Sequence, residues 1–197
     1  YPLSHHHDLR VFYLFLISAG LMLAGRFLDK NFYKQKNYAE FILFLLIGPI
    51  LASGLQLASG SMLDLEVILF SMVWGLSILF LIHVSNFSAI LKSSQARISN
   101  TVTQMGFDRA KFFLTVWMLF VLLAVVAHQV FFHGVNFVLV ALLPLIFLFY
   151  FLTKKIKSIQ SPLSSDLAII RKQAQYFFLS VALFFIVQSV SLLGVGF

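Results

Sequence analysis

Hydrophobic residues along this chain are gathered into long runs that short polar segments separate. Apolar runs of about 18 or more residues are long enough to cross the ~30 Å hydrocarbon core of a membrane as helices. Short connections, such as the His133-Gly134 pair, predict that neighbouring helices form antiparallel hairpins. The pattern predicts an all-α, polytopic transmembrane helix bundle with six spans, near residues 11–28, 39–58, 65–85, 110–132, 135–153 and 174–194.

The composition supports a membrane protein. Hydrophobic residues make up 60% of the 197 residues and charged residues only 11%, against roughly one-quarter charged in a soluble domain. A soluble domain of this composition would have too little polar surface to cover its core. The absence of cysteine excludes disulfides, thiolate metal sites and a cysteine nucleophile. Because the sequence starts at Tyr1 without a signal-peptide pattern, we expect residues 1–197 to be a single transmembrane domain and the C-terminal two-thirds of a longer chain.

The basic residues predict the orientation in the membrane. All but one of the 14 Lys and Arg residues fall on alternate connections, after the first, third and fifth spans, and the exception is Arg10. Positive charge is retained on the cytoplasmic side of membranes. We therefore expect these three connections to be cytoplasmic, in a multi-pass protein of the bacterial inner membrane.

Small residues within the spans predict close helix contacts. Gly20 lies in the first span, Gly48 and Gly54 in the second, and Ser71 and Gly75 in the third. Small side chains let the backbones of membrane helices approach one another. We expect helix crossings at these positions.

Two prolines fall inside predicted spans, Pro49 in the second and Pro144 in the fifth. Proline removes a backbone donor and clashes with the preceding turn of a helix. Both spans are therefore expected to be kinked, most simply as a packing device.

Polar side chains within the spans are costly in lipid and often mark function. For Gln56, Gln129 and Gln188 the sequence favours hydrogen bonds between helices. His83 and Asn86 lie three residues apart at the end of the third span, so they share one helix face. For this pair the sequence favours neither of two roles, contact with a ligand or a hydrogen bond between helices.

Residues 83–111 form a polar connection with four cations and only one acid, Asp108. We expect a short helix near residues 99–108, and Asp108 is available to cap the fourth span. The connection contains no Ser-His-Asp set, phosphate-binding glycine loop or zinc-protease motif. Positive charge on a cytoplasmic connection would also account for the cations without any ligand. The four cations are Lys92, Arg97, Arg109 and Lys111.

Two segments resemble a known family. The run Ala39-Glu40-Phe41, the Gly48-Pro49 pair and a closing pair of glycines, Gly54 and Gly60, are similar to the fifth helix of UbiA-type intramembrane prenyltransferases. The likeness is nearest to their dihydroxynaphthoate polyprenyltransferase branch, which acts in menaquinone synthesis.

The second aspartate-rich loop of that family reads Asn-x-x-Asp-x-x-x-Asp and ends some residues later at a glycine. Aligning Gly106 with that glycine places Asn86 on the leading Asn. Ala89 and Ser93 then occupy the two aspartate positions, so both carboxylates are missing.

The resemblance implies helices four to nine of a nine-helix bundle. In the family, two aspartate loops hold Mg²⁺, which binds the diphosphate of an isoprenoid donor that alkylates an aromatic acceptor. The first such loop would precede residue 1, so this segment implies no cofactor, and Mg²⁺ only if an upstream motif exists. The resemblance implies no metal ligand and leaves the catalytic residues unknown. The residues expected at a diphosphate or anionic headgroup are His83, Asn86, Lys92, Ser93 and Arg97.

Three functions fit the sequence. The first is a UbiA-like prenyltransferase homologue of menaquinone- or ubiquinone-type biosynthesis with impaired or lost catalysis, so enzymatic activity stays open. The second is a non-catalytic lipid- or quinone-binding subunit of the same fold, and the third is a small transporter or channel. The expected partners are membrane lipids, an isoprenoid diphosphate or quinone, and other proteins of a membrane complex, with no nucleic acid.

Overall fold

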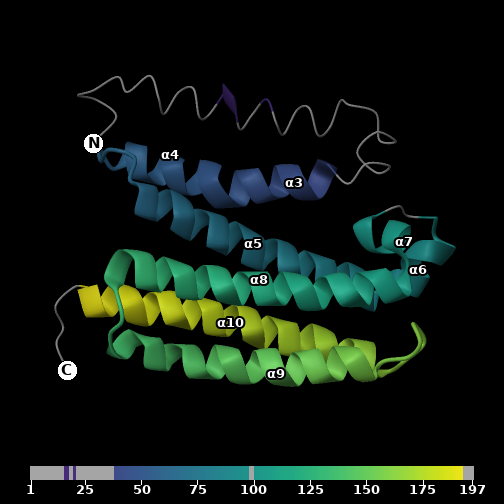
Figure 1. Ribbon diagram of the computed structural model, residues 1–197. Coiled ribbons are helices and arrows are strands. Elements are labelled where there is room, and N and C mark those ends of the chain that lie inside the picture. The colour runs from purple at the N-terminus through teal and green to yellow at the C-terminus, as the bar shows by residue number, and fades with distance from the viewer. Residues whose placement is uncertain (1–15, 18–19, 21–37, 98–99, 193–197) are drawn as a thin grey trace. The chain divides into compact units, whose positions relative to one another are not determined.

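The computed structural model describes residues 16–17, 20, 38–97 and 100–192 (Figure 1). These residues contain helices and no strand, which confirms the all-α prediction. Four helical segments are long and apolar enough to cross a membrane, so the chain is a multi-pass membrane protein by length and composition. They are α5 (Leu65–Ser88), α8 (Phe107–His133), the segment Phe137–Ser158, and α10 (Asp166–Leu192).

Contacts between residues divide the chain into two compact units, Tyr1–Leu79 and Phe80–Phe197, with the boundary inside α5. The single domain expected over 1–197 stays a prediction. The span predicted at 11–28 lies outside the described residues apart from positions 16, 17 and 20.

The first unit contains the span predicted at 39–58, which the structure divides into three pieces. α3 (Tyr38–Leu45) leads into a π-helical turn, η2 (Leu46–Ile50), and then into α4 (Leu51–Ala58). Pro49 lies in this turn, and Gly48 before it has a non-helical backbone with φ −87° and ψ −107°. The predicted kink at Pro49 is confirmed, since proline cannot donate to the preceding turn.

Gly48 and Gly75 meet at a helix crossing inside the first unit. A Cβ on Gly48 would lie 2.8 Å from the carbonyl oxygen of Ser71. A Cβ on Gly75 would lie 3.0 Å from the ring of Phe44 and 3.1 Å from the Gly48 Cα. The predicted contact is confirmed here, because only a missing side chain allows so close an approach. At Gly54 no such contact occurs among the described residues, since a Cβ there would meet none of their atoms within 4 Å.

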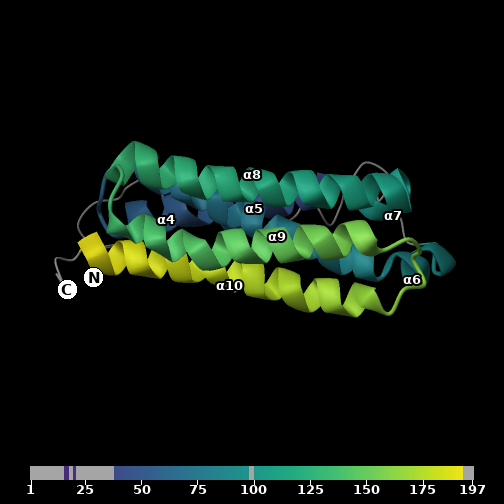
Figure 2. The ribbon, with the colours of Figure 1, turned by 60° about the horizontal axis from the view of Figure 1, so that its bottom comes forward.

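The second unit is built from α8, α9 (Leu143–Ser158) and α10, which run side by side after the end of α5 (Figures 1 and 2). The 3₁₀-helix η3 (Phe137–Leu142) joins α8 to α9. Buried residues recur every three or four positions along the long helices, so each turns one face inward. The outward faces carry exposed Phe112, Phe120 and Phe131, as expected of helices whose solvent is lipid. The buried residues include Leu114, Met118, Val121 and Val125 on α8 and Ala174, Phe177, Val181 and Phe184 on α10.

Several helix boundaries differ from the predicted spans, and three of the differences lie at charged ends. α8 begins at Phe107, α9 ends at Ser158 and α10 begins at Asp166, whereas the sequence indicated 110, 153 and 174. The additional turns carry charged residues, which hydropathy excludes from a span although the backbone stays helical there. Hydropathy therefore detected the apolar length of each helix and not the whole helix.

The kink predicted at Pro144 is wrong. α9 starts at Leu143, with Pro144 in its first turn. Proline is favoured at that position because the first amides of a helix have no partner within the helix. Pro144 therefore lies in the turn where η3 passes into α9, within the helical segment 137–158.

Candidate anion-binding site

Two short helices form the connection between α5 and α8. They are α6 (Ile90–Gln95) and α7 (Thr101–Met105), so the short helix expected near 99–108 is confirmed and α6 is an addition. α5 ends where the amide of Ala89 is shared, at 3.2 Å each, between the carbonyl oxygens of Ser85 and Asn86. Ala89 then becomes the N-cap residue of α6 and supplies no side-chain hydrogen bond to it.

α7 is held by a capping box. The side-chain oxygen of Asn100 accepts from the amide of Thr103, and the Thr103 hydroxyl oxygen accepts from the amide of Asn100, both at 2.9 Å. Such reciprocal bonds satisfy amides that the first turn leaves unpaired. This local pattern explains why five residues form a helix here.

Gly106 links α7 to α8 with φ +77°, a backbone conformation that favours glycine. It is the N-cap residue of α8, and no side chain caps that end. The prediction that Asp108 caps this helix is therefore wrong. Asp108 lies in the first turn, where its negative charge still complements the helix dipole.

His83 lies inside the second unit, only 2% exposed. Its ring is 5.0 Å from the ring of Phe113 and stacks at 6.0 Å on Trp117, both on α8. Sequence reasoning missed these two residues, although their four-residue spacing places them on one helix face. Asn86, one turn after His83, is half-buried. A ligand would reach His83 only by displacing this packing, whereas Asn86 lies nearer the connection.

Lys92 and Ser93 lie on α6, and Arg97 lies just after its end. Lys92 and Arg97 are exposed and Ser93 is half-buried. Among the described residues, the side chains of Lys92 and Arg97 take part in no hydrogen bond or ion pair. Arg97 has φ +52°, which ends the helix in the left-handed region. Both cations are thus available to an anion from outside the protein.

Mg²⁺ does not fit the residues of this connection. Mg²⁺ prefers carboxylate and phosphate oxygens in near-octahedral geometry. Ala89 supplies no ligand atom and Ser93 only a neutral hydroxyl. Across the part of the chain that the structure describes, no three His, Asp or Glu side chains are grouped to hold a metal ion.

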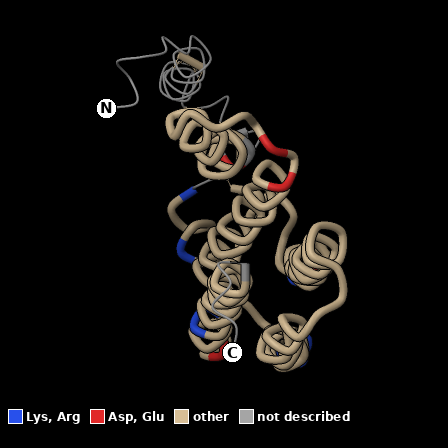
Figure 3. Tube along the Cα trace, turned by 90° about the vertical axis from the view of Figure 1, so that its left-hand side faces the viewer, with Lys and Arg blue, Asp and Glu red and all other residues tan. Residues whose placement is uncertain are grey.

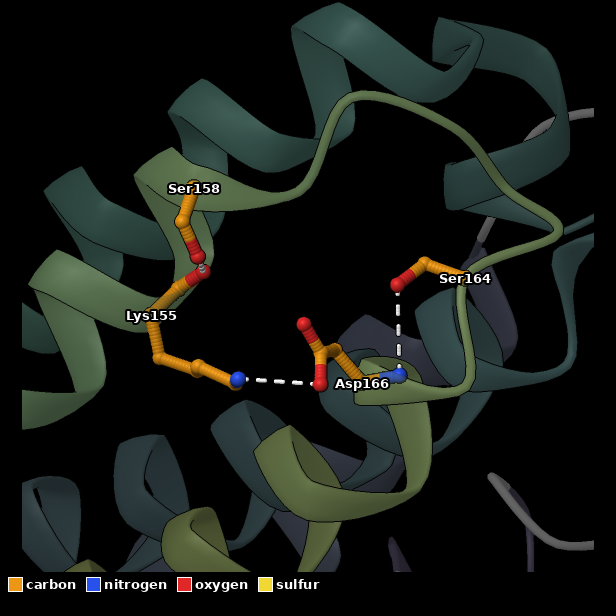
Figure 4. A network of polar contacts seen from close by, with 4 residues as sticks. All are labelled: Lys155, Ser158, Ser164 and Asp166. Carbon is orange, nitrogen blue, oxygen red and sulfur yellow. Dashed lines mark hydrogen bonds and ion pairs between the residues drawn. The ribbon is translucent and has the colours of Figure 1, made fainter.

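The connection between α9 and α10 also carries basic residues, but two cations there have protein partners. The Lys155 Nζ lies 2.9 Å from Asp166 Oδ1, an ion pair that joins the end of α9 to the start of α10 (Figure 4). The Asp166 amide donates to Ser164 Oγ at 3.2 Å. Lys111 of α8 donates to the carbonyl oxygen of Ile159 at 2.8 Å. The sequence grouped Lys111 with the other cations of residues 83–111, but its ammonium group is bonded to the protein itself.

Charge is unevenly placed in the second unit. In Figure 3 the helices are drawn almost entirely in tan, which marks residues other than Lys, Arg, Asp and Glu. Lys and Arg of this unit lie on or beside the α5–α8 and α9–α10 connections, which are at the same end of α8 and α9 (Figure 1). The basic residues of the second unit thus lie at one end of its helices, and the side of the membrane that this end faces stays a prediction.

Comparison with family models, with curated proteins and with solved structures found no match for this chain. The resemblance to UbiA-type prenyltransferases therefore rests on the two sequence segments alone.

Proposed function

We propose that this protein is a UbiA-type prenyltransferase homologue of the bacterial inner membrane with impaired or lost catalysis. In this proposal α6 binds the diphosphate of an isoprenoid, or an anionic lipid headgroup, directly through its cations. The observation that carries it is that Lys92 and Arg97 are exposed and have no partner among the described residues, next to Ala89 and Ser93 in place of two carboxylates.

Lys and Arg can replace a metal bridge at a phosphate. Their charge-assisted hydrogen bonds to phosphate are short and about twice as strong as neutral ones. Arg97 offers a planar fork for two oxygens and Lys92 a compact charge. Half-buried Ser93, next to Lys92 on the same helix, adds a neutral donor.

Prenyl transfer breaks the bond between C1 of the isoprenoid and the diphosphate oxygen, and the leaving group keeps the electron pair. An aromatic carbon then bonds to C1 and the ring loses its proton. Cations beside the diphosphate stabilise its growing charge. Two side chains that lack fixed partners do this less well than a rigid site, so weak or absent transfer is expected.

The catalytic test compares prenyl transfer by the full-length protein with that of Ala89→Asp, Ser93→Asp and the double variant. Activity that appears with both carboxylates and Mg²⁺ would identify a disabled active site on an intact scaffold. Rapid transfer by the unmodified protein, unchanged by the substitutions, would refute the loss of catalysis.

The binding test uses farnesyl diphosphate and vesicles containing phosphatidylglycerol as separate probes. Replacing Lys92 and Arg97 by Gln removes charge-assisted bonds, and we expect affinity for one probe to fall about tenfold or more, the equivalent of ~1.4 kcal/mol. Lys154→Gln with Lys157→Gln removes two exposed cations of the other connection and is the matched control. Equal losses in both double variants would show only general attraction to a basic surface.

We also infer that both basic connections of the second unit are cytoplasmic. The chain has no cysteine, so a single cysteine at exposed Ser94 or Ser158 reports its own side of the membrane. Both are expected to react with an impermeant thiol reagent only from the cytoplasmic side. Labelling of Ser94→Cys from outside would refute the orientation.

The second candidate is a non-catalytic lipid- or quinone-binding subunit, which the same Ala89 and Ser93 favour. Headgroup binding without transfer in any variant, the double aspartate variant included, would support it. The transporter or channel hypothesis stays untested.

A further inference from the structure

A second group of buried polar side chains lies at the opposite end of the second unit, where α8 turns into α9 (Figure 1). Gln129 of α8 is fully buried, Gln188 of α10 is 4% exposed and His128 is 5% exposed. None of them belongs to the anion-binding site. Buried polar groups inside membrane spans are uncommon and often functional.

Hydrogen bonds fix the orientation of the Gln129 side chain. The Asn136 side-chain oxygen accepts from the amide of Val138 at 3.1 Å, so the atom there must be the oxygen. Gln129 Nε2 donates to this oxygen at 3.2 Å and to the carbonyl oxygen of Gly134 at 3.3 Å. Its two N–H donors are used, and the remaining atom, Oε1, is an acceptor.

That acceptor is buried and has no hydrogen-bond partner among the described residues. The orientation does not depend on an arbitrary choice between nitrogen and oxygen, because a backbone amide determines it. Gln129 therefore presents a fixed, unpaired acceptor inside the bundle.

Gln188 supplies an unpaired donor at the same end. One end of its side-chain amide, placed as Nε2, is buried and has no hydrogen-bond partner in the described part of the chain. No hydrogen bond with a described residue fixes this amide, so it can turn its N–H donors toward an acceptor at this end. Phe185, one helical turn earlier, packs edge-on against His128 at 5.5 Å between ring centroids. Residues three apart share a helix face, so Gln188 lies on the side of α10 that faces the end of α8.

We propose that this end of the second unit binds a hydroxyl group, which donates to Gln129 Oε1 and accepts from Gln188 Nε2. A hydroxyl is the smallest group with both functions. Two sources share this chemistry, a water molecule and the hydroxyl of a membrane lipid or other amphiphile. The rings of Phe132 and Phe185, both packed against His128, supply apolar surroundings that would suit the chain of an amphiphile. The proposal does not depend on prenyl transfer or on anion binding.

The test compares the midpoint of thermal unfolding of Gln188→Met with that of the unmodified protein, both as the full chain in detergent. The sign of the difference decides. Methionine keeps the length of the side chain and removes the donor. If the donor is truly unpaired, its removal is neutral or stabilising. If it binds a hydroxyl, the midpoint of thermal unfolding falls by about 2–4 °C. Gln175→Met, at an exposed position of the same helix, is the matched control.

Two further measurements identify the source. The first adds 1-dodecanol or dodecyl methyl ether, which lacks the hydroxyl. If an amphiphile hydroxyl binds, the unfolding midpoint of the unmodified protein rises with 1-dodecanol alone, and that of Gln188→Met rises with neither. A nuclear Overhauser effect between water and the Gln188 side-chain amide, with no effect of dodecanol, indicates water. A Gln188→Met midpoint equal to or above that of the unmodified protein, without either signal, would overturn the proposal. Should Gln188→Met fail to fold, the alcohol titration and the water signal of the unmodified protein decide alone.

Discussion

The two basic connections of the second unit use similar charge in different ways. In the α9–α10 connection Lys155 pairs with Asp166 at 2.9 Å, and Lys111 reaches from α8 to the carbonyl oxygen of Ile159 at 2.8 Å. In the α5–α8 connection Lys92 and Arg97 are exposed and have no partner among the described residues. If both connections are cytoplasmic, as we propose, the retention of positive charge on that side accounts for the presence of all four. Only the partners distinguish charge that supports the fold from charge available to a ligand.

The acids explain part of this difference. Asp166 begins α10 and lies within reach of Lys155 across a short turn. In the α5–α8 connection the residues that the family would make acidic are Ala89 and Ser93. Neither Ala89 nor Ser93 carries a carboxylate, so neither can pair with the neighbouring cations as Asp166 pairs with Lys155.

The largest effect on stability is expected from Lys111→Met. The substitution keeps the alkyl stem but leaves the carbonyl oxygen of buried Ile159 without its donor, which costs about 1–3 kcal/mol. The midpoint of thermal unfolding in detergent should fall by about 2–4 °C per kcal/mol. Arg109→Met, at an exposed cation two residues away, should shift it little. Equal shifts would mean that Lys111 contributes only net charge.

A smaller change of opposite sign is expected from Ala89→Asp. Ala89 is the N-cap residue of α6 and gives it no side-chain hydrogen bond. Aspartate is strongly preferred at this position, so the free energy of unfolding should rise by about 0.5–1 kcal/mol. Ser94→Asp adds the same charge to an exposed position within α6 and separates capping from general attraction. If Ala89→Asp stabilises no more than Ser94→Asp, capping is not the cause.

The ion pair between Lys155 and Asp166 should contribute less. Its side chains are 30% and 34% exposed, and such pairs contribute about 0.2–1 kcal/mol. Asp166→Asn should lower stability by that amount at low salt, and the loss should shrink as NaCl screens the pair. Asp108→Asn is the control, since Asp108 also lies in the first turn of its helix. Identical losses would assign the effect to the helix dipole.

The smallest change in stability is expected at Lys92 and Arg97, although their replacement should weaken anion binding most. Lys92→Gln with Arg97→Gln removes exposed charges and should alter the free energy of unfolding by less than about 0.5 kcal/mol. The same variant should lose farnesyl diphosphate or phosphatidylglycerol affinity, while Lys111→Met should retain it. A large loss of stability in the double Gln variant would contradict the view that these cations are free for a ligand.

The sequence by itself determined the class of this protein and most of its helices. Apolar length and helical spacing depend on local residues, so the helices at 65–88, 107–133, 137–158 and 166–192 were found with errors at their charged ends. Close contacts at Gly48 and at Gly75 were also predicted, because small residues let membrane helices approach, but the structure alone shows that these two glycines meet each other.

Only the tertiary structure decided which polar residues have partners. Lys111 and Ile159 are 48 residues apart, and no local pattern relates them. His83 was expected at the connection, but Phe113 and Trp117 of another helix bury it. The orientation of Gln129 likewise depends on Asn136 beyond a helix end. Hydropathy describes what a residue costs in lipid, whereas its role depends on atoms that the fold brings within hydrogen-bond distance.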